Sequence, residues 1–199
     1  MGQAAAPDPG RPRALSGGSS VRRARAALAR LALERARRAG AGAPAPGARR
    51  WLRLACLLDP DFGDAHRALL AAQQAAGDPL GGMALAERWA ARFQHSPDAW
   101  VTLGGACAAA YRTREALVAY ERALQIEERG DAALAAGHLY RRLGDPSTAG
   151  ARFARAYAAG AGPDALKENA RALLAAGDRA AAQQAIALWE GETGRTWNA

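Results

Sequence analysis

The residue types that most often carry out chemistry are sparse in this sequence. Its three histidines are His66, His95 and His138. None of them has a second histidine four residues away, the spacing that places two imidazoles on one helical face to hold a metal. The two cysteines, Cys56 and Cys107, form neither a C-x-x-C metal motif nor a disulfide framework. The sequence therefore predicts no metal site and no cofactor.

Catalytic arrangements based on carboxylates, nucleophiles or phosphate-binding glycines are equally difficult to assemble. The acidic residues are spread over helix starts and polar faces and do not converge as a pair. Cys56 and Cys107 stand where small apolar residues are wanted, so buried free thiols are expected. Gly104-Gly105 lies inside a helical pattern, without the strand that a phosphate-binding glycine loop needs. We expect no enzymatic activity and assign no catalytic residue.

A self-similarity of 33–34 residues organises the chain from about residue 20 onward. In its clearest unit one helical face carries apolar and small residues at i, i+3, i+4 and i+7, namely Trp100, Leu103, Gly104 and Cys107. A second face follows after a turn, formed by Ala116, Tyr120 and Ala123. About 33 residues later the second face recurs as Ala149, Phe153 and Ala156, and again as Ala182, Ile186 and Trp189. The predicted turns between paired helices lie at Gly77-Asp78-Pro79, Gly144-Asp145-Pro146 and Gly177-Asp178.

The pattern W-x-x-L-G-x-x-C followed by A-x-x-x-Y-x-x-A resembles the signature of the tetratricopeptide repeat family. The resemblance implies an all-α fold, a right-handed α-solenoid of about five helix–turn–helix repeats and roughly ten helices. It also implies that Gly104 lets the paired helix approach closely. The bulky Tyr120 is then expected to fill the space between repeats.

The predicted organisation has three parts. A disordered arm rich in Pro, Gly and Ser covers residues 1–19, and a short tail without a capping helix covers residues 191–199. Between them the repeats are expected at about 20–61, 62–96, 97–129, 130–162 and 163–190. The first helix, about residues 20–39, is followed by a loop longer than the tight family turn, so we expect it to pack loosely or to detach. An uncapped last helix would favour self-association at the C-terminal end.

The first helices of such repeats are expected to line a concave groove that binds an extended peptide or a helix of a partner protein. The groove positions are Arg67, Gln74, Val101, Gly105, Leu134, His138, Arg141, Arg142, Lys167 and Arg171. Their C-terminal members are basic, and a protonated His138 would add to them. Arginine binds carboxylates through two parallel hydrogen bonds, so an acidic segment or a chain terminus is the predicted ligand. The alternative is that these arginines only solvate an alanine-rich helix.

The net charge of +8 lies entirely in the N-terminal quarter of the chain. Residues 1–50 contain 11 Arg and 2 acidic residues, whereas residues 51–199 are nearly neutral. Lys167 is the single lysine, a bias that a GC-rich genome would also produce. The N-terminal segment has the composition of an organelle transit peptide but lacks the apolar stretch of a secretory signal.

The basic first helix suggests a second function. Val21, Ala24, Leu28 and Leu31 form an apolar stripe beside several arginines. Such a helix can bind nucleic acid or an anionic membrane surface. It lacks Trp or Phe on its apolar face and any base-reading motif, so we expect the helix simply to pack on the next helix. The main prediction is therefore a cytoplasmic, non-catalytic adaptor, and the alternative is association with nucleic acid or membrane through this helix.

Overall fold

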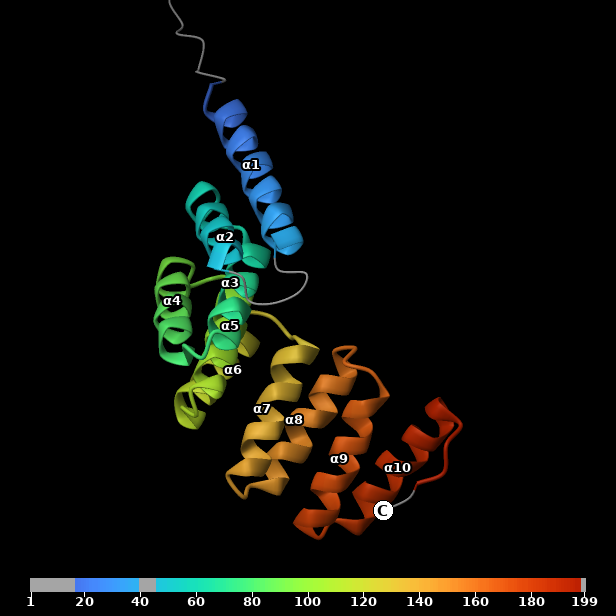
Figure 1. Cartoon of the computed structure of the whole chain (residues 1–199). Coiled ribbons are helices and arrows are strands. Elements are labelled where there is room, and N and C mark those ends of the chain that lie inside the picture. Colours follow the sequence, from blue (N-terminus) through green and yellow to red (C-terminus); the bar gives the residue numbers. More distant parts are fainter. Residues whose placement is uncertain (1–16, 40–45, 198–199) are drawn as a thin grey trace, which may run out of the picture. The chain divides into compact units, whose positions relative to one another are not determined.

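The computed structural model of the chain describes residues 17–39 and 46–197, and the secondary structure within these ranges is helical (Figure 1). The helices are α1 Gly17–Ala39, α2 Pro46–Leu58, α3 Gly63–Ala75, α4 Pro79–Arg92, α5 Pro97–Ala109, α6 Thr113–Ile126, α7 Gly130–Arg142, α8 Pro146–Ala158, α9 Pro163–Ala176 and α10 Arg179–Thr193. The predicted arm lies outside the described residues except for its last three positions, which belong to α1. Most of the predicted loop over residues 40–47 also lies outside them. The predicted all-α fold is confirmed.

The turns within helix pairs follow from a glycine followed by an aspartate. Gly77, Gly144 and Gly177 have φ angles of +74°, +81° and +83°, a conformation that side chains with a Cβ disfavour. The aspartate after each glycine is the N-cap of the next helix. Its carboxylate accepts a hydrogen bond from the backbone N–H three residues later, at 2.8 Å for Asp78 and 3.0 Å for Asp145 and Asp178. The local sequence therefore determines where one helix ends and the next begins.

The turn between α5 and α6 departs from this pattern. Tyr111 occupies the position that glycine holds in the other three turns, and its φ is +60°. Its side chain is 84% exposed, so its contribution to packing is small. Arg112 follows as the N-cap, and its side chain makes no capping hydrogen bond. The repeat with the clearest family signature thus contains the least favourable turn.

Replacing Tyr111 by glycine should stabilise the protein. The substitution removes the steric cost of a left-handed conformation, about 1–2 kcal/mol, and part of this gain is offset because glycine is more flexible in the unfolded chain. We expect a net gain of about 1 kcal/mol in the free energy of unfolding, measured as a higher urea midpoint by circular dichroism. Gly144→Ala serves as the control, since it places a Cβ at φ +81° and should lower the midpoint. A lower midpoint for Tyr111→Gly would contradict the assignment of strain to this residue.

Close contacts between paired helices recur at one position of the repeat. A Cβ added to Gly104 in α5 would lie 2.7 Å from the ring of Tyr120 in α6. Thirty-three residues later, a Cβ on Gly137 in α7 would lie 2.6 Å from the ring of Phe153 in α8. The expected role of Gly104 is confirmed. Tyr120 also belongs to a core cluster with Ala132, Ala133 and Ala136 of α7, as its predicted place between repeats requires.

The chain divides into two compact units, residues 1–65 and 66–199. In the first unit α1 packs on α2, with Ala29, Ala32 and Ala55 in a core against which Trp51 is packed. The guanidinium of Arg35 lies 5.2 Å from the centre of the Trp51 ring. The prediction that the first helix packs loosely or detaches is therefore wrong. Alanine-to-alanine contact lets the two helix axes approach closely.

The face of α1 that packs on α2 is not its apolar stripe. The buried residues are Ala29, Ala32, Leu33 and Ala36. In the apolar stripe, Ala24 is exposed and Val21, Leu28 and Leu31 are 58%, 52% and 51% exposed. The expectation that the first helix packs on the next helix is confirmed, but α2 covers the narrower alanine face of α1 and leaves the stripe exposed.

Candidate binding surfaces

Ion pairs connect the starts of successive first helices in the second unit. Asp98, in the first turn of α5, accepts hydrogen bonds from Arg67 of α3 at 3.2 Å and from Arg129 at 2.6 Å. Arg129 immediately precedes α7 and also binds both carboxylate oxygens of Asp131, at 3.0 and 2.8 Å. The hydrogen bonds from Arg129 lower the pKa of Asp131, although partial burial acts in the opposite direction. The predicted groove residue Arg67 therefore helps to align three consecutive first helices.

The predicted residues in the middle of this surface are small or partly buried. Val101 and Leu134 pack against the core cluster between α5 and α8, and Gly105 lies near the hydroxyl of Tyr120. Gln74 at the end of α3 is exposed. A shallow hollow of about 500 Å³ opens beside Leu134, between the start of α7 and the loop that precedes α9. In the middle of the predicted groove, some residues therefore pack against the core, and others remain accessible to a ligand.

The basic residues of the last two first helices gather around an acidic residue. Glu168 of α9 accepts a hydrogen bond from Arg171 at 3.0 Å through one oxygen and from Arg141 of α7 through the other. Its side chain is only 17% exposed. Arg141 also contacts Nδ1 of His138 at 3.3 Å. The structure therefore brings together three predicted residues, with a carboxylate that partly neutralises them.

The remaining predicted basic residues lie apart from this cluster. Lys167 places its ammonium group 5.6 Å from the centre of the Trp189 ring in α10. Arg142 is exposed at the end of α7. The prediction that a protonated His138 adds positive charge is not supported at neutral pH. Burial, followed by the neighbouring Arg141, lowers the pKa of His138 from its ordinary value.

Two residues that organise this surface were absent from the sequence prediction. Glu168 has one visible signal, since it stands three residues before Arg171 on the same helix. Its contact with Arg141 spans 27 residues and could not be read from local spacing. Arg129 precedes a helix and therefore lies outside the helical faces from which the predicted positions were taken. Both residues act through partners in neighbouring repeats.

The C-terminal end of the second unit is covered by its own tail. The Trp197 ring packs edge-on against Trp189, with centroids 5.7 Å apart, and the backbone N–H of Trp197 donates to Glu190 at 2.7 Å. A hollow of about 500 Å³ lies here, lined by Lys167, Trp189, Gly194, Arg195, Thr196 and Trp197. Leu188 of α10 remains 56% exposed. The last helix is therefore partly covered by the tail, which no sequence pattern indicated.

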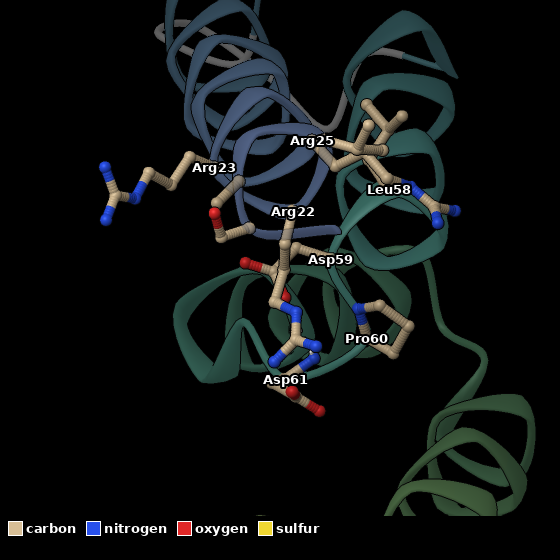
Figure 2. Close-up of a pocket in the computed structure, with 10 residues that line it drawn as sticks. Arg22, Arg23, Arg25, Leu58, Asp59, Pro60 and Asp61 are labelled. Atoms are coloured by element: carbon tan, nitrogen blue, oxygen red, sulfur yellow. Dashed lines mark hydrogen bonds between the residues drawn. The ribbon is translucent and has the colours of Figure 1, made fainter. Parts of the chain in front are cut away.

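A larger hollow lies in the first unit, between the start of α1 and the turn from α2 to α3. Its volume is about 870 Å³, and it is lined by Arg22 and Arg25 on one side and by Asp59 and Asp61 on the other. Figure 2 shows the Arg22 side chain reaching toward Asp61, whereas Arg23 points away from the other labelled residues. Carboxylates therefore face the arginines here, so the hollow does not present a purely positive surface to an anion.

The cysteines lie in separate packing clusters as free thiols. Cys107 is buried in the core formed by α5 to α8, and Cys56 is half-buried in the first unit. Burial raises the pKa of Cys56 to about 11 and is also the main reason why the pKa of Cys107 is raised. Both thiols are therefore protonated at neutral pH and poor nucleophiles. Within residues 17–39 and 46–197 no group of three His, Cys, Asp or Glu side chains is arranged to hold a metal ion.

Among the described residues, no helix combines the length and the apolar character needed to cross a membrane.

Comparison with known proteins identifies the fold. No protein-family model and no curated protein sequence matches the chain. Among solved structures, PilF of Pseudomonas aeruginosa superposes with a TM-score of 0.65 at 22% identity, over 91% of this chain and 80% of PilF. A thermophilic TPR protein of Thermus thermophilus gives 0.58 at 19% identity, over 87% and 92% of the two chains. A tetratricopeptide repeat protein of Parabacteroides merdae gives 0.65 at 16% identity, over 86% and 69%.

These likenesses show that the chain has the fold of a tetratricopeptide helical solenoid. Solenoids of this kind present extended concave surfaces.

Proposed function

From this fold, we propose that the chain is a non-catalytic adaptor that holds a peptide or helix of a partner protein against the first helices of its repeats, α3, α5, α7 and α9. The partner segment is acidic or ends in a free carboxylate. It binds the C-terminal part of the surface, where Arg141 and Arg171 already share a carboxylate acceptor. The accessible small residues of α5 accommodate its side chains.

The observation that carries this proposal is the arrangement around Glu168. Two guanidinium groups from different repeats converge on one carboxylate, the geometry that a ligand carboxylate would also use. Both arginines remain about half exposed, at 44% and 48%, so a ligand can reach them without unfolding the helices. Arg142 and Lys167 lie on the same two helices and add positive charge.

The test compares affinity capture from a cell lysate by the wild-type chain and by an Arg141→Glu/Arg171→Glu variant. We expect a protein that is recovered with wild type and depleted at least tenfold with the variant, because like charges then face the ligand. The matched control is Arg114→Glu/Arg122→Glu, which reverses two exposed charges on the second helix α6. Equal recovery with all three forms would contradict the proposed site.

A different substitution at the same site should strengthen partner binding. Glu168→Gln keeps the size of the side chain but removes the charge that competes with an acidic ligand. We expect it to bind the captured partner at least about fivefold more tightly, since a like charge at contact distance costs about 1 kcal/mol even at the dielectric constant of water. Titration calorimetry with the purified partner measures the change. A loss of affinity would mean that the partner does not approach this carboxylate.

The proposed location is the cytoplasm, which fits free thiols at Cys56 and Cys107 that are not paired with each other. Self-association at the C-terminal end is a secondary proposal, supported by the exposed Leu188.

A further inference from the structure

The exposed side of α1 combines an apolar stripe with a row of arginines. The α1 stripe consists of Val21, Ala24, Leu28 and Leu31, whose spacing of three and four residues places them on one face. Because α2 covers the alanine face instead, the three large members of the stripe are more than half exposed. Isolated leucines on a protein surface are common and need no explanation. Three large apolar side chains aligned on one exposed helical face instead indicate an interaction site.

The charge beside this stripe is strongly positive. Helix α1 contains seven arginines and one acidic residue, Glu34. Arg23, Arg30 and Arg37 are exposed and repeat every seven residues, so they form a row of roughly 21 Å along the helix. With 100° per residue, this α1 arginine row lies about 140° around the helix from the α1 stripe and about 110° from the buried face, so the row and the stripe flank that face on opposite sides. The exposed half of α1 is thus apolar along one side and cationic along the other.

The α1 stripe and the α1 arginine row together distinguish between the possible binding partners of α1. Nucleic acid would satisfy the arginines but would not use three aligned apolar side chains. A partner helix could pack on the stripe through anchors at three- and four-residue spacings, but it would leave the arginine row, about 140° away around α1, without a partner. The boundary between lipid headgroups and acyl chains accepts both features at once, because apolar side chains enter it while arginines reach the phosphates.

We propose that α1 binds in the plane of a membrane surface that contains anionic phospholipids. The α1 stripe enters the boundary between headgroups and acyl chains, and the α1 arginine row binds lipid phosphates. The helix lies on the membrane and does not cross it, in agreement with its charged composition. This activity is separate from partner binding in the second unit, so the adaptor could present its partner at a membrane.

The test uses the full chain with vesicles of phosphatidylcholine alone or mixed three to one with phosphatidylglycerol, in a sedimentation assay. We expect wild type to bind only the mixed vesicles. Leu28→Gln/Leu31→Gln should bind at least tenfold more weakly. Arg23→Gln/Arg30→Gln/Arg37→Gln should bind roughly 100-fold more weakly, since each arginine near an anionic surface contributes about fivefold.

Matched controls change the same residue types on the second unit. Val118→Gln/Leu188→Gln replaces two exposed apolar side chains, and Arg114→Gln/Arg122→Gln/Arg179→Gln replaces three arginines at the surface. Both controls should bind vesicles like wild type, and circular dichroism should show unchanged helix content in all forms. The Arg141→Glu/Arg171→Glu variant should also bind vesicles normally, so the two proposals can fail separately.

Three outcomes would overturn the proposal. Wild type could bind both vesicle types equally or neither of them. The Leu28→Gln/Leu31→Gln variant could bind mixed vesicles as tightly as wild type, which would mean that electrostatic attraction by itself explains the binding. A DNA duplex or oligo-glutamate could bind more tightly than mixed vesicles and lose affinity in the α1 variants only, which would assign α1 to nucleic acid or to an acidic protein instead.

Discussion

Phe153→Ala should lower the free energy of unfolding by about 3–5 kcal/mol, the usual cost of removing a fully buried phenylalanine. Phe153 has no exposed surface and packs in a cluster with Ala149 of its own helix and Ala172 of α9. Its ring also lies against Gly137 of α7. One side chain therefore joins three consecutive helices, and the cavity left by alanine cannot be closed by a local shift.

The measurement is urea unfolding followed by circular dichroism together with tryptophan fluorescence. Both probes are needed, because repeat proteins can unfold in parts and Trp189 and Trp197 report on the C-terminal end. Phe153→Leu is the control and should cost only about 1 kcal/mol, since most of the buried volume is kept. If Phe153→Ala unfolded at the same urea concentration as Phe153→Leu, the ring would not be the central contact between these helices.

The substitution should also weaken the proposed binding surface. The ring of His138 packs edge-on against Phe153 at 5.0 Å, and the Arg141 guanidinium lies 6.0 Å from its centre. Without the phenyl ring, both side chains lose the surface that orients them.

Gly137→Ala should destabilise the protein by about 2 kcal/mol, although alanine is the better helix former. The new Cβ would lie 2.6 Å from a ring carbon of Phe153, which is fully buried and has no space to move. Helices α7 and α8 must then separate, so a propensity gain of about 1 kcal/mol is outweighed by the loss of packing between them.

Gly191→Ala provides the matched comparison for this prediction. Gly191 is also helical, but no atom lies within 4 Å of the position its Cβ would take. The same change should therefore raise the urea midpoint by roughly the propensity difference of up to 1 kcal/mol. Opposite signs for the two variants would show that close approach, and not helix propensity, requires glycine at position 137. The same sign would contradict that explanation.

The repeat architecture could be predicted from the sequence because it depends on local patterns. A glycine and an aromatic residue sixteen positions apart recur as Gly104 with Tyr120 and as Gly137 with Phe153. In each pair the structure places the ring against the glycine, as the resemblance to the tetratricopeptide repeat family implied. The Gly-Asp turns are local in the same sense, since a left-handed residue and an N-cap act within three residues of each other.

Which face of α1 is buried could not be predicted in this way. Hydrophobicity alone selects Val21, Leu28 and Leu31, but the buried face consists of Ala29, Ala32, Leu33 and Ala36. The choice depends on the shape of α2, which is separated from α1 in the sequence by an intervening segment. Small side chains allow close contact along the helix, and this packing outweighs the burial of a few larger residues.

The charge balance of the candidate binding surface was also decided by tertiary structure. The sequence placed Arg141 and Arg171 on first helices and Glu168 three residues before Arg171, but it contained no indication that Glu168 would also bind Arg141. Ion pairs between repeats depend on how far successive helices are displaced and rotated, and a periodic pattern does not specify these quantities. The sequence by itself thus determined the helices, their turns and their repeat. Tertiary packing decided which apolar face stayed exposed and which charges were already neutralised, because both depend on contacts between residues distant in the chain.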